Sequence, residues 1–266
     1  MKLSPYELYE AAVIDARSDV RLFRRFFLEI NGTYPENYRE DFSGTFKHAV
    51  EWVKCNRRNR SWAVDLDPAP LKFGTQKHLT KLSDEQKSRV RVLKQDVRKP
   101  ISEKLNFVTA MNFSYCIFKE RDVLKDYFKG VYRSLHQKGL FLVDVMGGQQ
   151  LMEASEDRRS IPATKEHPRL TYFWEQLNFD GFTHEAKFAM HFKISPSSRR
   201  LKNIFTYDWR LWTLPELKDL MMEAGFKRTH IYWEGNHRDG SGNGVFSRRK
   251  YEEDCLVWVA YLIGEK

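Results

Sequence analysis

Polar residues recur at one kind of position along this 266-residue chain, directly after short stretches that predict β-strands. In "YREDFSGTF" (residues 38–46), Arg39, Glu40 and Asp41 lead into a turn at Gly44, and an amphipathic helical pattern follows. The residues after four later predicted strands are Asp65 and Leu66, Asp96 and Val97, Asn112, Phe113 and Ser114, and Asp144. Because ligands of open α/β sheets bind outside the carboxyl ends of the strands, this recurrence predicts a polar ligand-binding edge.

The spacing of the first two positions favours a nucleoside-like ligand. Asp65 follows Gly44 by 21 residues, and an acidic residue about 20 residues after the glycine turn commonly accepts hydrogen bonds from ribose hydroxyls. A carboxylate accepts such bonds more strongly than a neutral group. Asp96, at the next strand end, would then lie beside the base and could accept a hydrogen bond from an exocyclic amino group.

The elements that position these residues alternate between strand and helix. A capping box at Ser4 begins a helix that is expected to continue to Ile30. Five predicted strands before residue 149 are separated by helical segments, which favours a doubly wound, mostly parallel sheet. The later segments "FTHEAKFAMHFKI" and "RLKNIFTYDWRLW" predict antiparallel strands, and the helix "LPELKDLMMEAGF" precedes two closing strands.

We therefore expect a single α/β domain over residues 1–266. Residues 1–32 would form an N-terminal helical segment, and residues 149–212 a β-rich, antiparallel insertion after strand 5 that caps the substrate. The glycine-rich stretch "YWEGNHRDGSGNG" predicts a hairpin or a mobile loop, in which Glu234 and Asp239 are candidate acceptor ligands.

Composition and charge limit the partners. The net charge of +9 allows nucleic acid, but the basic residues are interleaved with acids, and the densest cluster, "KCNRRNR", lacks aromatics. Three cysteines without paired spacing argue against a disulfide framework and a zinc site, and no histidine pair predicts a metal. The longest apolar run, "CLVWVAYLIG", is about half of a bilayer span. We expect a cytoplasmic protein that contacts no membrane.

The order of "EDFSGT", "VDLD", "QDV" and "MNFSYC", with "LFLVDV" after a long helix, resembles the class I S-adenosylmethionine-dependent methyltransferases. The resemblance implies a Rossmann-like sheet of seven strands in the order 3-2-1-4-5-7-6, with strand 7 antiparallel. It implies S-adenosyl-L-methionine as cofactor and S-adenosyl-L-homocysteine as product. The family places the methionine part at Glu40, Asp41 and Gly44, the ribose at Asp65 and Leu66, adenine at Asp96 and Val97, and the sulfonium beside Asn112, Phe113 and Ser114.

Two positions depart from the family pattern. The usual loop is acidic-x-Gly-x-Gly-x-Gly, but this chain has Phe42 and Phe46 at the outer glycine positions. A dinucleotide needs close backbone approach at several glycines, so the loss counts against NAD or FAD. Arg39 is expected either to reach the methionine carboxylate or to form a surface salt bridge with Glu40 or Asp41. Tyr9, with Tyr6, could close over the cofactor or anchor the helix.

Methyl transfer is an in-line displacement, so most of the acceleration can come from alignment, and a dedicated base is optional. The candidate catalytic residues are Tyr115, which follows the fourth strand, and Tyr207 and Arg210 in "FTYDWRLW". Strand alternation sends Tyr207, Trp209 and Leu211 to one face and Asp208, Arg210 and Trp212 to the other. Most aromatic residues of the insertion are expected to pack the sheet.

The leading prediction is a methyltransferase acting on a small molecule. The alternatives are a methyltransferase acting on nucleic acid or protein, and a non-catalytic protein that binds S-adenosylmethionine. The identity of the acceptor and the oligomeric state are not predicted.

Overall fold

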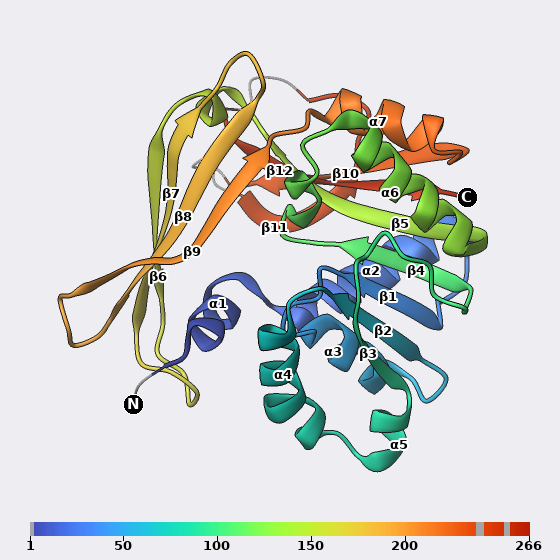
Figure 1. The fold of residues 1–266 in the computed structure, drawn as a ribbon, viewed down its shortest axis with the longest axis horizontal. Coiled ribbons are helices and arrows are strands. Elements are labelled where there is room, and N and C mark those ends of the chain that lie inside the picture. Colours follow the sequence, from blue (N-terminus) through green and yellow to red (C-terminus); the bar gives the residue numbers. More distant parts are fainter. Residues whose placement is uncertain (1–2, 238–241, 253–255) are drawn as a thin grey trace.

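The computed structural model of the chain describes residues 3–237, 242–252 and 256–266 and contains two β-sheets. Figure 1 shows the four-stranded sheet beside the central sheet. The helices are α1 (Pro5–Val13), α2 (Ala16–Asn31), α3 (Lys47–Cys55), α4 (Pro68–Lys77), α5 (Asp84–Ser88), α6 (Arg121–Ser134) and α7 (Leu214–Glu223), with 3-10 turns η1 (Leu79–Lys81), η2 (Ser114–Ile117) and η3 (Gln149–Met152). In Figure 1 the first helix, α1, lies between the four-stranded sheet and the fourth helix, α4.

The central sheet contains β1 (Asn37–Asp41), β2 (Arg60–Asp65), β3 (Val90–Lys94), β4 (Leu105–Ala110), β5 (Leu135–Gly147), β10 (Arg228–Asn236), β11 (Gly242–Arg248) and β12 (Trp258–Glu265). Its order is β11-β10-β12-β5-β4-β1-β2-β3. The strands β1 to β5 are parallel where they pair, and β12 is antiparallel to both β5 and β10.

The expected count of seven strands is wrong, because β11 adds an eighth at the outer edge. It pairs antiparallel with β10, as the second arm of the glycine-rich hairpin. The other seven strands follow the order β3-β2-β1-β4-β5-β12-β10. The hairpin tip, including the candidate ligand Asp239, lies outside the described residues.

The helices cover both faces of the central sheet. On one face, apolar side chains of α2 and α3, such as Phe23, Phe27 and Trp52, pack against Tyr38 and Phe107 of the sheet. On the other face, α6 and α7 pack on β4, β5 and β12. These two layers bury the strands on both sides, which explains their continuous apolar stretches.

The first helix is shorter than expected. The chain becomes extended at Ile14 (φ −116°), and Asp15 caps a new helix by accepting a hydrogen bond from the Ser18 N–H at 3.2 Å. The single helix predicted from Ser4 to Ile30 is therefore α1 followed by α2. The break matters for the site, because α1 leaves the central sheet and packs against the second one.

The second sheet, which we call the cap, contains β6 (Ser155–Ile161), β7 (Leu170–Phe179), β8 (Glu185–Ile194) and β9 (Arg200–Arg210) in that order. All its neighbouring strands are antiparallel. Its inner face joins the main core through Phe188 and Trp209. Among the described residues, no helix has the length and apolarity that a membrane span requires.

Candidate active site

The turn after β1 keeps a glycine-like backbone although two of its residues are phenylalanines. Phe42 (φ +53°) and Phe46 (φ +49°) lie in the left-handed region, as does Gly44 (φ +50°). Such a conformation costs a bulky residue about 1–3 kcal/mol, and burial offsets this cost. Phe46 is fully buried and Phe42 packs on the Tyr127 ring at 5.8 Å. The turn is therefore retained by side-chain packing.

Gly44 is the point at which a ligand can approach the backbone. A Cβ added there would meet no atom within 4 Å, so the space in front of it is open. Its N–H donates to Asp65 Oδ2 at 2.7 Å, and Asp65 Oδ1 accepts from the Asp67 N–H at 2.9 Å. Burial raises the pKa of Asp65, and these N–H donors oppose that shift. Each oxygen retains a second lone pair for a ligand hydroxyl.

Leu66, which follows Asp65, is unusual among the apolar residues at strand ends because 65% of it is exposed. An exposed leucine next to an open polar edge offers an apolar surface for a planar ring. Asp96, at the next strand end, accepts from the Arg98 guanidinium at 2.6 Å, and this bond lowers the pKa of Asp96. The pairing with Arg98 leaves less of the Asp96 carboxylate free than the sequence suggests.

Arg39 and Asp41 do not face the open edge. Arg39 is buried and donates to Asp41 Oδ1 at 2.5 Å and to the Val97 carbonyl. The Tyr127 hydroxyl, on α6, donates to Asp41 Oδ2 at 2.7 Å. The expected salt bridge between Arg39 and Asp41 is present, but it is buried beneath α6 and not at the surface. The expectation that Arg39 meets a ligand carboxylate is corrected.

Glu40 begins a chain of charged groups that sequence reasoning did not foresee. Its Oε2 accepts from the Ala49 N–H at 2.8 Å, and its Oε1 is 2.9 Å from His48 Nδ1. The other ring nitrogen, His48 Nε2, is 2.9 Å from Asp19 Oδ2. Burial disfavours the imidazolium, but the two carboxylates outweigh it and raise the pKa of His48 to about 10. His48 is therefore a cation with a carboxylate at each ring nitrogen, Glu40 at Nδ1 and Asp19 at Nε2.

The turn after β4 is the next part of the edge. Asn112 (φ +57°) and Phe113 (φ +56°) are both left-handed. Their N–H groups donate to Asp144 Oδ2 at 2.7 Å and Oδ1 at 2.9 Å. Burial raises the pKa of Asp144 to about 7, against the opposing effect of these two donors. Ser114 donates to the Met111 carbonyl at 2.8 Å, which closes the turn.

Two of the three candidate catalytic residues are misplaced for chemistry at this edge. Tyr115 is buried and its hydroxyl donates to the Asp144 carbonyl at 2.8 Å, so it belongs to the core. Arg210 lies over the Trp212 ring at 3.7 Å and donates to Glu216 and to the Lys119 carbonyl. Both expectations are corrected.

The strand alternation in β9 explains the position of Arg210. Tyr207 and Trp209 point inward to the aromatic cluster, whereas Asp208 pairs with Lys119 at 2.6 Å on the other face with Arg210. Glu234 is also away from the site, because its Oε1 accepts the Gly244 N–H within the β10–β11 hairpin at 2.8 Å.

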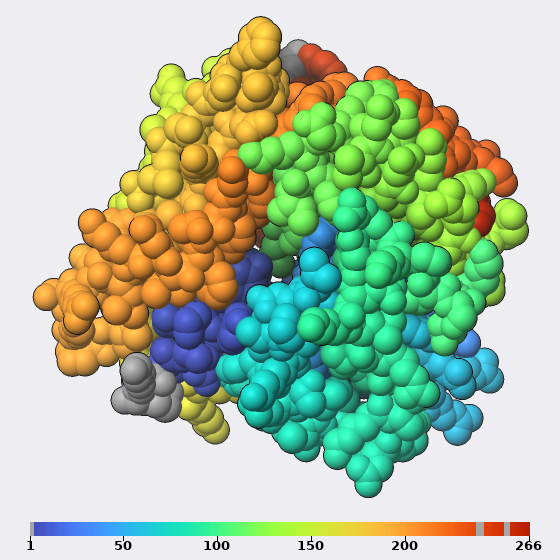
Figure 2. Space-filling view, in the orientation of Figure 1, coloured from blue at the N-terminus to red at the C-terminus, as the bar shows by residue number. Residues whose placement is uncertain are grey.

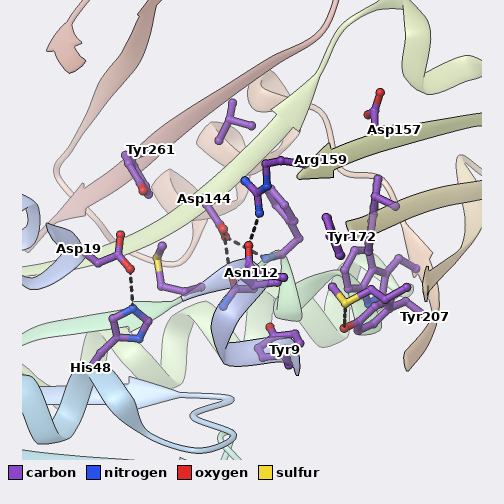
Figure 3. A pocket seen from close by; sticks show the side chains of 18 of the residues that line it. Tyr9, Asp19, His48, Asn112, Asp144, Asp157, Arg159, Tyr172, Tyr207 and Tyr261 are labelled. Atoms are coloured by element: carbon purple, nitrogen blue, oxygen red, sulfur yellow. Dashed lines mark hydrogen bonds and ion pairs between the residues drawn. The ribbon is translucent and has the colours of Figure 1, made fainter. Parts of the chain in front are cut away.

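A cavity of about 540 Å³ lies between the polar edge and the cap. Figure 2 shows the surface hollowed between α1 (dark blue), the cap strands (orange) and the region of α4 (cyan). Asp144 and Asn112 lie at the centre of the cavity in Figure 3, with His48 and Asp19 on one side and Tyr172 and Tyr207 on the other. The aromatic lining residues are Tyr9, Phe113, Tyr172, Trp174, Tyr207, Trp209 and Tyr261.

The helix α1 closes one side of this cavity. Glu10 Oε1 lies 2.6 Å from Nε2 of His78, beyond the end of α4, and Lys77 pairs with Glu7 at 3.2 Å. Tyr9 packs edge-on against Phe205 of the cap at 5.3 Å. Tyr6 lies between Phe73 and Phe205, at 5.2 and 6.2 Å. The helix thus joins α4 to the cap.

One acidic cluster with a histidine lies outside the cavity. Glu156, Glu175 and His191 bring ligand atoms together on neighbouring cap strands. His191 Nδ1 accepts the Asn203 N–H at 2.8 Å, so Nε2 carries the proton toward Glu175 at 2.6 Å. Arg200 pairs with Glu156 at 2.5 Å. The cluster is explained by these ion pairs and hydrogen bonds.

Solved structures identify the fold that holds this edge and cavity. No family model matches the sequence, and no curated protein is significantly similar to it. An S-adenosylmethionine-dependent methyltransferase from Clostridium acetobutylicum ATCC 824 is 18% identical, with a TM-score of 0.67 over 97% of this chain and 96% of that one. DesVI of Streptomyces venezuelae is 12% identical, with a TM-score of 0.69 over 98% and 99%.

A third similar structure is CalS10 from Micromonospora echinaspora, an amino pentose methyltransferase bound to S-adenosylmethionine. It is 10% identical, with a TM-score of 0.68 over 98% of both chains. The chain therefore has the Rossmann-like fold of the class I S-adenosylmethionine-dependent methyltransferases.

Proposed function

We propose that this protein is an S-adenosylmethionine-dependent methyltransferase acting on a small-molecule acceptor. The observation that carries the proposal is the junction at Asn112 and Phe113. Their turn belongs to the polar edge through Asp144, and both residues also line the aromatic cavity. A ligand along the edge and an acceptor in the cavity would meet there.

The residues of the edge fit the cofactor in their chemistry. Asp65 would accept the ribose hydroxyls, and the exposed face of Leu66 would pack against adenine, with Asp96 and the Val97 backbone beside it. The open space in front of Gly44 suits the amino-acid part of the molecule, which carries no phosphate. Glu40 does not face the ligand in this arrangement; it holds the turn after β1 against α3 by accepting the Ala49 N–H.

When bound, S-adenosylmethionine would supply a methyl group attached to a sulfonium: an acceptor lone pair forms a bond to the methyl carbon, and the electron pair of the broken C–S bond stays on sulfur. The protein's contribution is then alignment and exclusion of water. Asn112, Phe113 and Ser114 would lie beside the reacting methyl. Tyr9 on α1 and Tyr207 in the cap would hold the acceptor from opposite walls.

The acceptor side favours a small molecule. The cavity of about 540 Å³ falls within the usual range for small-molecule sites, roughly 300–1,000 Å³. Among the similar structures, KedS8 from Streptoalloteichus sp. ATCC 53650 is described as a sugar N-methyltransferase (13% identity, TM-score 0.64, over 98% and 93% of the chains). We propose that the cap strands β6 to β9 form the acceptor-binding part of one domain.

A thermal-shift panel tests the proposal. S-adenosylmethionine and S-adenosylhomocysteine should both raise the melting temperature, whereas NAD and FAD should not. A shift with NAD alone would refute it. Incubation with methyl-labelled S-adenosylmethionine and a library of small acceptors should yield labelled product, and binding without any product would favour the non-catalytic alternative.

A further inference from the structure

The acceptor cavity contains two polar groups that the protein itself leaves incompletely paired. Asp144, at its floor, is only 5% exposed. Its oxygens accept two backbone N–H groups, but no cation of the described residues forms an ion pair with it. The second group is the Trp209 indole N–H, which is buried and has no hydrogen-bond partner within the described chain. Buried polar groups are rarely left in this state.

Phe113 lies between these two groups and contacts both. Its N–H donates to Asp144 Oδ1, and its ring packs against Trp209 with centroids 6.3 Å apart. Tyr207 and Trp174 lie next to Trp209 at 4.4 and 6.0 Å. A molecule in contact with Asp144 would therefore lie against aromatic faces with an N–H donor nearby.

The other charges of the cavity do not neutralise Asp144. The remaining charged side chains that line it are Asp19, His48, Asp157, Arg158 and Arg159. His48 lies between Asp19 and Glu40.

The two arginines are directed elsewhere. Arg159 donates to the Ala12 carbonyl and lies over the Tyr172 ring at 5.5 Å. Arg158 lies over Phe173 at 5.9 Å, and Phe173 does not line the cavity. The uncompensated charge at the floor is thus negative.

We propose, on the basis of the proposed function, that the acceptor is a primary or secondary amine carrying an oxygen substituent. Its ammonium group donates to Asp144, and its oxygen accepts from Trp209 Nε1. A buried carboxylate in an aromatic surrounding suits an organic cation.

Asp144 also has a role in releasing the nucleophile. An ammonium has no lone pair, so one N–H proton must leave before nitrogen can attack. The proton passes to a carboxylate oxygen of Asp144, and the electron pair of the broken N–H bond stays on nitrogen. Burial raises the pKa of Asp144 to about 7, which suits a proton acceptor near neutral pH.

Calorimetric titration of the protein saturated with S-adenosylhomocysteine tests the charge preference directly. The probes are benzylamine, benzyl alcohol and benzoate, which share a ring and differ in charge at about pH 8, where the amine is protonated. Benzylamine should bind about tenfold or more tightly than benzyl alcohol, and benzoate should not bind. Equal affinities, a preference for benzoate, or no binding of any probe would overturn the proposal.

Variants separate the two contacts. Asp144→Asn should reduce the affinity for benzylamine to that for benzyl alcohol. Asp157→Asn, at an exposed acid of the same cavity, should leave it unchanged within about twofold. In the unmodified protein, 2-amino-2-phenylethanol should bind about two- to tenfold more tightly than benzylamine, because its hydroxyl oxygen accepts from Trp209.

Trp209→Phe keeps an aromatic ring but removes the indole N–H. In this variant, 2-amino-2-phenylethanol should therefore bind no more tightly than benzylamine. If 2-amino-2-phenylethanol still bound more tightly than benzylamine, the acceptor oxygen would not be hydrogen-bonded to Trp209 Nε1. The Trp209→Phe measurement and the probe series on the unmodified protein stand even if Asp144→Asn does not fold. Failure to bind S-adenosylhomocysteine would refute the proposed function, whereas binding it without amine selectivity would refute only this inference.

Discussion

The carboxyl edge of the central sheet and the inner face of the cap meet at one cavity, but different interactions fix their side chains. At the edge, backbone N–H groups hold the carboxylates of Glu40, Asp65 and Asp144. In the cap, ring contacts hold Trp174, Tyr207 and Trp209. The positions of the edge carboxylates are therefore set by the main chain. The shape of the cap surface depends on its side chains, so amino-acid substitutions there can change it.

This difference implies that substitutions at the edge affect folding and cofactor binding, whereas substitutions in the cap affect the acceptor. Asp144 is the exception, because it belongs to the edge and also lines the acceptor cavity. The following predictions test that division, beginning with the largest expected effect.

Arg39→Met should lower the free energy of unfolding by about 3–5 kcal/mol, because it leaves the Asp41 carboxylate buried without its cation. Urea unfolding measures this loss. Arg98→Met is the control, since Arg98 pairs with Asp96 at the surface, and it should cost about 1 kcal/mol or less. A stable Arg39→Met protein that no longer binds S-adenosylhomocysteine would show instead that Arg39 is a ligand.

Asp65→Ala should abolish the stabilisation by S-adenosylhomocysteine. A ligand at 100 times its dissociation constant adds about 2.7 kcal/mol to the free energy of unfolding, and the variant should lose nearly all of it in a thermal-shift assay. Asp67→Ala is the matched control, because Asp67 caps α4 through the Ala69 N–H at 2.8 Å. That variant should melt lower but keep the ligand-induced shift, whereas a full shift in Asp65→Ala would exclude the ribose assignment.

Glu10→Gln should weaken the attachment of α1 at the boundary of the two regions. Its bond to His78 is buried, so the loss should be about 1.5–3 kcal/mol near neutral pH. Burial alone would raise the pKa of Glu10, but His78, Thr45 and Lys47 together outweigh burial and lower it. Its contribution is therefore present above about pH 4 and lost as the pH falls through its folded pKa.

Unfolding curves for the Glu10→Gln and unmodified proteins over this pH range should converge in acid. A deficit that is the same at all pH values would mean that the Glu10 charge does not hold α1.

Arg210→Ala should have the smallest effect. Arg210 is on the outer face of the cap, so binding of S-adenosylhomocysteine and of benzylamine should change by less than about twofold. Calorimetric titration measures both affinities. Tyr207→Ala, three residues earlier on the inner face, should weaken benzylamine binding while leaving S-adenosylhomocysteine unaffected. A reversed pattern would mean that the cap faces have been assigned incorrectly.

The edge was largely predictable from the sequence because its positions follow from topology. Parallel strands end at one side of the sheet, so Asp65, Asp96 and Asp144 were found from strand ends alone. The sequence did not show which carboxylates face the ligand. Arg39 and Asp41 alternate with Glu40 along β1, and only packing on α6 reveals that they are buried on the other side.

The cap was less predictable. The pattern in "FTYDWRLW" predicted that Tyr207 and Trp209 share a face, but not that this face lines the cavity. Asp19 and His48 were missed because they lie on helices, where a lone histidine or aspartate carries no motif. Tyr115 was misjudged because its distance from the strand end does not reveal that its ring turns into the core.

A crystal structure of the protein with S-adenosylhomocysteine would show where the cofactor binds along the edge of the central sheet. The ribose hydroxyls should lie within hydrogen-bonding distance of Asp65, with the adenine against Leu66 and the sulfur facing the cavity beside Asn112. Density for the ligand elsewhere, or no density at this edge at a saturating concentration, would refute the cofactor site proposed at Asp65 and Leu66.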